Sequence, residues 1–269
     1  MSVTLKFRKS GHGYPFIILH GLYGASDNWL SISRKLEERF TVYVPDLRNH
    51  GHSPHTTSHS YEEMVDDLHL FFVDHHIEKA IILGHSMGGK VAMMFAAEYP
   101  ELVKSLLVAD IAPKSYNLLE RPYKTVLQHE LILGLMEQLN LAAVKSRKEI
   151  EHFMSDKLKD STLRQFLIKN IHRNKADFFE WKINVPILKQ ALLAITTGVS
   201  SEWFDDRRPI LGYPVTFLRG LNSDYISDED LPMIKRIYPD AKIIDIPDAG
   251  HWLHAEQPAK FIEAVLSVV

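Results

Sequence analysis

The chain has 269 residues, of which 45% are hydrophobic and 24% charged, proportions typical of a soluble globular protein with one large domain or two small ones. Its formal net charge of −3 argues against a nucleic-acid or anionic-membrane partner, because both are usually bound by a surplus of Lys and Arg. Cysteine is absent, which excludes disulfides, thiolate metal ligands and a cysteine nucleophile.

The N-terminal residues lack the apolar segment of a signal peptide. No apolar run reaches the roughly 18–20 residues needed to span a bilayer. We therefore expect no membrane insertion and a cytoplasmic location.

The first 110 residues alternate between short apolar runs and helical patterns. Strands are predicted at 3–8, 16–19, 41–44, 80–83 and 106–108, and helices from 26 to 36, 61–75 and 87–99. The strands show no polar alternation, which is typical of a parallel sheet covered on both faces. This βαβ order predicts an α/β protein with a doubly wound, mostly parallel sheet.

The pattern changes at Pro113. Helices are predicted at 118–139, 142–158, 162–171 and 187–194, with Pro122 and Gly134 as breaks. Strand patterns return at 215–218 and 242–246, with helices at 231–238 and 258–269. The sequence therefore predicts a core formed by 1–112 and 209–269, into which an all-helical cap, 113–208, is inserted.

A Gly-x-Ser-x-Gly pattern at Gly84, Ser86 and Gly88 lies between a predicted strand and a predicted helix. A strand-to-helix turn this sharp strains the backbone of its central residue, and side chains at the two glycine positions would collide with the strand and helix. The turn places the Ser86 hydroxyl at a helix N-terminus, where backbone N–H groups favour a developing anion. Ser86 is therefore the predicted nucleophile.

His20 and Gly21 directly follow the strand predicted at 16–19. Acyl transfer needs two donors for the oxyanion, one from the residue after the nucleophile and one from a loop after an early strand. Met87 and Leu22 fit these two positions and are the predicted oxyanion hole.

The chain has 15 histidines, so position decides which one is the general base. His251 lies beyond the last predicted strand, as the order serine, acid, histidine requires in this arrangement. His254 is its competitor, with a surface or core role. His50, His52, His55 and His59 are irregularly spaced without nearby carboxylates, so we interpret them as solvated loop residues and predict no metal site.

Two aspartates compete for the role of the acid that orients the histidine. Asp224 follows the strand at 215–218, and Asp110 follows the strand at 106–108. The position three residues after Gly220, where the acid commonly lies, is Ser223, which cannot stabilise an imidazolium by charge. We favour Asp110 as the acid, with Ser223 as an auxiliary hydrogen-bond partner and Asp224 as the alternative.

Together these motifs resemble the α/β-hydrolase superfamily, and most closely its small YbfF-type bacterial esterases. The resemblance covers nearly the whole length, is weakest in the cap, and rests on His20-Gly21, Pro45 to Ser53, Gly84 to Gly89, Asp110 to Pro113, Gly220 to Ser223 and Ala249 to Trp252. It implies hydrolysis of a small-molecule acyl ester or thioester without a cofactor, and in those esterases the acid falls on the residue matching Asp110.

Substrate is expected between the carboxyl edge of the sheet and the cap. Candidate acyl-pocket residues are the aromatic side chains Tyr116, Tyr123, Phe178, Phe179 and Trp181. Arg121 and Lys124 are candidates for an anionic leaving group such as coenzyme A.

Three other functions are weighed against ester hydrolysis. Epoxide hydrolases and haloalkane dehalogenases share the fold but use a carboxylate nucleophile, which Ser86 argues against. A C–C bond hydrolase or a menaquinone-pathway-type lyase would use the same triad and stays open. A non-catalytic ligand-binding protein is disfavoured by an intact Ser86, His251 and acid.

Overall fold

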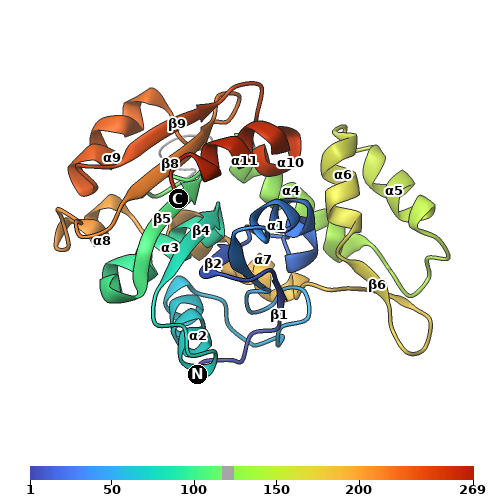
Figure 1. Cartoon of the computed structure of the whole chain (residues 1–269). Coiled ribbons are helices and arrows are strands. Elements are labelled where there is room, and N and C mark those ends of the chain that lie inside the picture. Colours follow the sequence, from blue (N-terminus) through green and yellow to red (C-terminus); the bar gives the residue numbers. More distant parts are fainter. Residues whose placement is uncertain (117–123) are drawn as a thin grey trace.

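The computed structural model describes residues 1–116 and 124–269, and Figure 1 shows it as one sheet with helices packed around it. The sheet has seven strands in the order β1-β3-β2-β4-β5-β8-β9. Only β1 runs antiparallel to its neighbour. The bounds are β1 (Phe7–Ser10), β2 (Tyr14–Leu19), β3 (Phe40–Pro45), β4 (Ala80–His85), β5 (Val103–Ala109), β8 (Val215–Gly220) and β9 (Lys242–Ile246).

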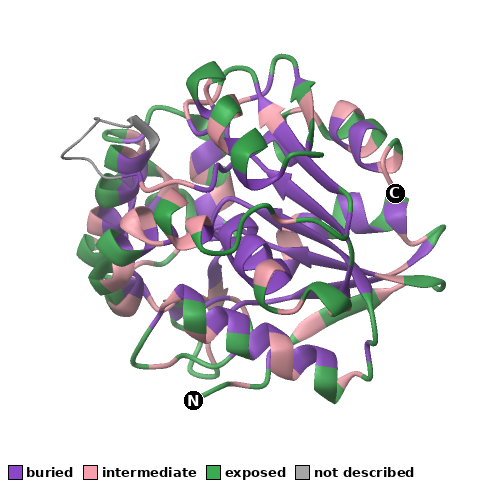
Figure 2. Cartoon of the chain, turned by 90° about the vertical axis from the view of Figure 1, so that its left-hand side faces the viewer, coloured by how far each residue is buried: buried purple, intermediate pink, exposed green. Residues whose placement is uncertain are grey.

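Both faces of the sheet are buried, as the apolar strand patterns predicted. In β2, Phe16 and Ile18 belong to one hydrophobic cluster, whereas Ile17 and Leu19 belong to the other. This division follows from the period-2 alternation of side chains along a strand. Figure 2 shows the buried strands enclosed by helices whose outer sides are exposed.

The helices divide between the two faces in the same way. One cluster contains side chains of α1 (Leu30–Leu36) and α11 (Pro258–Leu266). The other contains side chains of α2 (Tyr61–Asp74), α3 (Met87–Glu98) and α9 (Leu231–Ile237). Short helical turns complete this part of the chain: η1 (Ser26–Trp29), η2 (Pro100–Leu102), η3 (Asp228–Asp230) and α10 (Leu253–Glu256). The prediction of a doubly wound sheet is confirmed.

The first strand begins later than the 3–8 range predicted for it. The Val3 amide donates to the Asp67 carboxylate (2.7 Å) and the Lys6 amide to Ser53 Oγ (2.8 Å), so side chains replace a strand partner there. Ladder pairing with β3 starts only at Phe7.

The segment between β5 and β8 is mainly helical. It contains α4 (Lys124–Gln138), α5 (Arg147–Ser155), α6 (Ser161–Ile168), α7 (Val185–Thr197) and α8 (Ser201–Asp205). The helix predicted from residue 118 begins outside the described residues, and α4 continues through Gly134, so no break occurs there.

The prediction that this segment is all-helical is wrong. Strands β6 (Ile171–Arg173) and β7 (Phe179–Trp181) pair antiparallel. The chain reverses direction between β6 and β7 in a turn that its Asn and Asp residues favour. Asn174 Oδ1 accepts hydrogen bonds from two following amides, and Asp177 adopts a positive φ of 65°. Strands of three residues are too short to produce a detectable alternation.

Candidate active site

Ser86 occupies a sharp turn between β4 and α3. Its backbone has φ 52° and ψ −120°, a strained conformation for a residue with a side chain. A Cβ on Gly84 would lie 2.2 Å from the Gly88 carbonyl oxygen, and a Cβ on Gly88 would lie 2.5 Å from the carbonyl oxygens of Leu19 and His20. Both glycines are therefore steric requirements of the turn that presents the Ser86 hydroxyl.

His251 lies in the loop between β9 and α10, directed at Ser86. Its Nε2 is 2.9 Å from Ser86 Oγ. The loop is held by the His85 side chain, whose Nε2 donates to the His251 carbonyl oxygen at 2.8 Å. The imidazole also stacks on the Tyr225 ring, with centroids 3.9 Å apart and an interplanar angle of 15°. These contacts restrict the imidazole to an orientation in which Nε2 reaches the hydroxyl.

Asp110 follows β5 directly and adopts a positive φ of 50°. Its Oδ2 lies 2.8 Å from His251 Nδ1, and accepts a hydrogen bond from Ser223 Oγ at 2.5 Å. Its Oδ1 accepts from the Gly220 amide at 3.1 Å. Asp224 lies instead on the wall of a cavity beside His251. Of the two predicted candidates, Asp110 is thus the one whose carboxylate contacts the His251 imidazole.

Burial shifts the pKa values of His251 and Asp110. It lowers the pKa of the His251 imidazole, so the ring is neutral at rest and its Nε2 can accept a proton. Burial raises the pKa of the Asp110 carboxyl, while the hydrogen bonds from Ser223 and Gly220 oppose that rise by stabilising the carboxylate.

Leu22 and Met87 are the residues predicted to supply the oxyanion donors. Both residues line the same small cavity as Ser86. Within the described part of the chain, neither amide donates a hydrogen bond. The loop carrying Leu22 approaches closely because Gly21 has no side chain: a Cβ there would be 2.8 Å from His85 Nδ1 and 3.1 Å from Ser86 Cβ.

The cavity at Ser86, which we call the acyl cavity, measures about 30 Å³. The sheet side contributes the nucleophile turn and α3, whereas α4 and α7 of the inserted segment contribute Val126, His129, Ile195 and Thr196.

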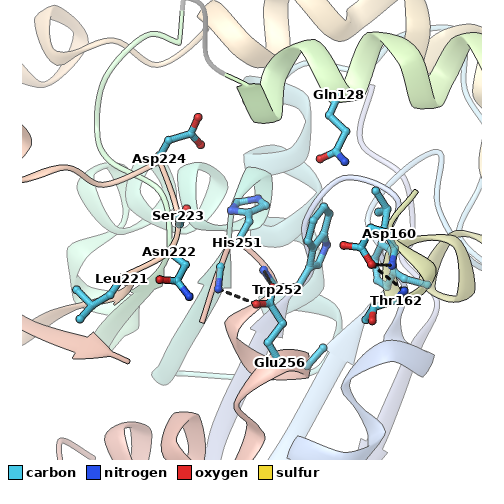
Figure 3. A pocket seen from close by; sticks show the side chains of 14 residues that line it. Gln128, Asp160, Thr162, Leu221, Asn222, Ser223, Asp224, His251, Trp252 and Glu256 are labelled. Carbon is cyan, nitrogen blue, oxygen red and sulfur yellow. Dashed lines mark hydrogen bonds between the residues drawn. The ribbon is translucent and has the colours of Figure 1, made fainter. Parts of the chain in front are cut away.

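A second cavity of about 700 Å³, which we call the outer cavity, lies beside His251 (Figure 3). The figure shows Gln128 reaching into it from α4, Asp224 on the loop after β8, and Trp252 next to His251. Its described lining residues include the carboxylates Asp160, Asp224 and Glu256 but no Lys or Arg.

The aromatic residues predicted for the acyl pocket fall in different places. Tyr116 lines the acyl cavity. For the residues of the β6–β7 hairpin the expectation was wrong: Phe178 is 52% exposed, Phe179 packs beneath the Arg173 guanidinium, and Trp181 Nε1 donates to the Met136 carbonyl. Tyr123 and Arg121 lie outside the described residues, and the Lys124 side chain is also not described.

The interpretation of the histidines after Asp46 as solvated needs correction. His52 and His55 are exposed, but His50 and His59 are buried, with ring centroids 5.5 Å apart. The His50 ring also contacts the His20 ring, with centroids 5.1 Å apart. His254 is also a core residue, stacked on Trp29 with centroids 4.1 Å apart. No group of three metal-binding side chains occurs among the residues the structure describes.

Three residues next to the nucleophile were not singled out from the sequence. Tyr225 stacks on His251, and Lys90 and His129 line the acyl cavity. For Lys90 a signal existed, because a residue four after the nucleophile lies on the same face of the helix. Tyr225 and His129 meet the site only through tertiary packing.

Comparison with known proteins matches this architecture to a family. Residues 14–258 match the model of the alpha/beta hydrolase fold family. The chain belongs to the α/β-hydrolases. It is 30% identical to Esterase YbfF of Escherichia coli, over 93% of this chain and 91% of that protein.

Other relatives point to the same chemistry. A Danio rerio protein described as an sn-1-specific diacylglycerol lipase is 34% identical over 97% of this chain and 80% of its own length. A solved marine microorganism esterase is 45% identical, with a TM-score of 0.91 and full coverage of both chains. This α/β-hydrolase is an enzyme that hydrolyses carboxylic esters. No helix among the described residues is long and apolar enough to cross a membrane.

Proposed function

We propose that this α/β-hydrolase cleaves its esters through an acyl-enzyme on Ser86, with His251 as general base and Asp110 as the acid that orients it. The observation that carries the proposal is the continuous chain of contacts from Ser86 Oγ to His251 Nε2 (2.9 Å) and from His251 Nδ1 to Asp110 Oδ2 (2.8 Å). This is the geometry that nucleophilic acyl transfer requires.

In the first step His251 Nε2 takes the proton from Ser86 Oγ, which forms a bond to the acyl carbon. The carbon–oxygen bond to the alcohol then breaks as His251 returns the proton to the departing oxygen. Water, deprotonated by the same imidazole, attacks the acyl carbon and releases the acid, restoring the Ser86 hydroxyl. Asp110 keeps Nδ1 protonated, so that Nε2 is the nitrogen that accepts.

The amides of Leu22 and Met87 are the proposed oxyanion donors, supported by their position at the acyl cavity and their lack of other partners among the described residues. Two preorganised donors stabilise the tetrahedral intermediate more than the ground-state carbonyl, which is the source of rate acceleration. Residues 113–208 are the proposed cap, because α4 and α7 close the acyl cavity opposite the nucleophile.

The outer cavity is the proposed place for the leaving group, because it adjoins His251, which must protonate that group. Its three described carboxylates favour an uncharged alcohol over a polyanionic thiol such as coenzyme A. We therefore propose oxygen esters of neutral alcohols as better substrates than acyl-coenzyme A thioesters of the same acid. Equal or faster hydrolysis of acetyl-coenzyme A than of ethyl acetate would contradict this choice.

The proposed nucleophile is tested by covalent labelling. A fluorophosphonate probe should modify the wild-type enzyme once, on the tryptic peptide that contains Ser86, and should not modify Ser86→Ala. Ser33→Ala is the matched control, because Ser33 and Ser86 are each 6% exposed but Ser33 lies on α1, away from His251. Labelling of a different serine, or undiminished labelling of Ser86→Ala, would rule out the proposal.

A further inference from the structure

Lys90 places a buried amine in the wall of the acyl cavity. It lies one helical turn after the nucleophile, with its amide 3.1 Å from the Ser86 carbonyl oxygen. The side chain is 1% exposed, although lysine is almost never fully buried without an ionic partner. Burial lowers its pKa to about 7.

The contacts of Lys90 leave N–H donors unused. Nζ donates one hydrogen bond, to the Gly198 carbonyl oxygen at 2.7 Å, and lies 5.7 and 5.0 Å from the ring centroids of Tyr61 and Tyr116. No carboxylate pairs with it among the described residues. Since an amine has at least two N–H donors and an ammonium three, at least one remains for a ligand in either protonation state.

Most other polar groups of the acyl cavity are already engaged. The hydroxyls of Tyr61, Tyr116 and Thr196 each donate to a backbone carbonyl, at 2.8, 2.6 and 3.0 Å. His129 Nε2 is 3.0 Å from the Tyr225 hydroxyl, but its Nδ1 is buried and has no partner within the described part of the chain. Among the described polar side chains of this cavity wall, Lys90 Nζ therefore keeps spare N–H donors beside its one hydrogen bond, and His129 Nδ1 has no partner.

Buried polar atoms without partners are costly unless a ligand completes them. The rest of the wall is apolar, formed by Leu22, Met87, Ile111, Val126 and Ile195. A plain alkyl chain would satisfy this apolar part and leave the amine unpaired. A chain with an oxygen acceptor within reach of Lys90 Nζ would satisfy both.

We propose that the acyl cavity selects short acyl groups that carry an oxygen acceptor on the third or fourth carbon, and that Lys90 Nζ donates the hydrogen bond to that oxygen. The inference rests on the proposed function, because it places the acyl group between Ser86 and Lys90. Lys90 is thus a specificity-determining residue and takes no part in moving protons.

Matched ester pairs that differ by one oxygen test the inference. The rates kcat/KM are measured in a pH-stat for ethyl 3-oxobutanoate against ethyl butanoate and for ethyl 4-oxopentanoate against ethyl pentanoate. The wild-type enzyme should prefer the oxo ester of at least one pair by about 10- to 100-fold, the discrimination that a hydrogen bond to a charged or buried donor supplies. In Lys90→Met, which keeps the length and removes the donors, that ratio should fall to the ratio measured for hydroxide-catalysed hydrolysis of the same two esters without enzyme, because the electron-withdrawing oxo group alone activates the ester.

Lys114→Met is the matched control. Lys114 also lies over the Tyr116 ring, at 5.1 Å, but is paired with Asp230 and is absent from the cavity wall. Its ratio should stay within about twofold of wild type. A purely structural role of Lys90 would slow both esters of a pair equally and leave the ratio unchanged, which overturns the inference.

The two proposals fail differently. A wild-type ratio near 1 for both pairs, with normal fluorophosphonate labelling, refutes the role of Lys90 while the acyl-enzyme stands. Absent labelling refutes the proposed function itself. If Lys90→Met does not fold, Lys90→Gln replaces it, because glutamine keeps an N–H donor on a shorter side chain. Its oxo-to-alkyl ratio should then fall below that of wild type. An unchanged ratio overturns the inference.

Discussion

The proposed catalytic corner, formed by Ser86, Asp110 and His251, differs from the acyl cavity in how its polar groups are satisfied. In the corner, Ser86 Oγ, both imidazole nitrogens and both Asp110 oxygens have protein partners at 2.5–3.1 Å. In the acyl cavity, Lys90 keeps spare donors and His129 Nδ1 has no partner among the described residues. Under the proposed mechanism, the groups that move protons are positioned by the protein alone, whereas polar groups of the acyl cavity keep hydrogen-bonding capacity for a substrate.

The two regions also differ in backbone strain, which is present in the corner and absent from the part of the cavity wall that α4 and α7 contribute. Ser86 and Asp110 both have positive φ, at a cost of about 1–3 kcal/mol each. Each is held by a hydrogen bond from its amide, to the Ala109 carbonyl oxygen at 3.0 Å and the Leu218 carbonyl oxygen at 2.8 Å respectively. Of the cavity residues contributed by α4 and α7, none has a positive φ. Substitutions in the corner should therefore affect turnover far more than substitutions in the cavity wall.

The largest effect is expected at the nucleophile. Ser86→Ala should lower kcat for a short-chain p-nitrophenyl ester by about 10⁶, the typical loss for a triad nucleophile. Its thermal unfolding curve should match that of wild type, because the alanine keeps the turn and the glycines around it. Near-wild-type turnover with an unchanged curve would show that the corner is not where acyl transfer occurs.

The next effect separates the two aspartates. Asp110→Asn should lose about 10⁴ in kcat, because the amide can donate to Nδ1 and impose the wrong tautomer. Ser223→Ala should lose less, since it removes a hydrogen bond to a carboxylate worth about 1.5–3 kcal/mol. Asp224→Asn should lose less than about tenfold, since its charge acts on the imidazole only from the cavity wall. Steady-state kinetics on the three variants check the order, and a crippled Asp224→Asn beside an active Asp110→Asn would reverse it.

A smaller effect concerns pH. Burial lowers the pKa of His251 from its ordinary value of 6.5, and the base must be neutral to act, so activity is present above the lowered pKa and is lost as pH falls through it. We expect kcat/KM to stay nearly constant from pH 7 to about 5.5, where an ordinary histidine would be about 90% protonated. Assays after brief exposure, with activity rechecked at pH 7, exclude acid unfolding. A midpoint at 6.5 or above would contradict this prediction.

The smallest effects compare two aromatic residues of the inserted segment. Tyr116→Phe should lower the free energy of unfolding by about 1–3 kcal/mol, because its hydroxyl accepts from the Ala112 amide and donates to the Tyr225 carbonyl. Phe178→Ser, on the exposed hairpin, should change it by less than about 0.5 kcal/mol and leave the oxo-to-alkyl ester ratio unaltered. Denaturant unfolding measures both. Equal destabilisation would mean that Tyr116 contributes no more than a surface residue.

Sequence reasoning failed in two places, the inserted segment and the loop that follows β3. The β6–β7 hairpin escaped notice because strands of three residues carry no readable period, and its aromatic residues were placed in the wrong environment for the same reason. His50 and His59 were interpreted as solvated, because a polar residue in a loop is usually exposed and only the folded chain shows which loop is covered.

The sequence alone determined the alternation of apolar strands and amphipathic helices, the doubly wound sheet and the nucleophile turn. These are local features: side-chain periodicity reflects which faces are buried, and glycines at 84 and 88 are required by contacts within one short turn. The approach of the His20–Gly21 loop to that turn was predictable in outline from its place after an early strand.

Only the tertiary structure decided which carboxylate meets the imidazole. Asp110 and Asp224 follow neighbouring parallel strands, so both loops reach the same edge of the sheet, and the sequence favoured Asp110 without showing the contact. The register that pairs Ala109 with Leu218 places the Asp110 carboxylate beside the Gly220 amide and Ser223, and hence beside His251. The same long-range packing brought Tyr225 onto the imidazole and His129 to the acyl cavity, because contacts between distant segments depend on how elements dock and leave no periodic trace in the chain.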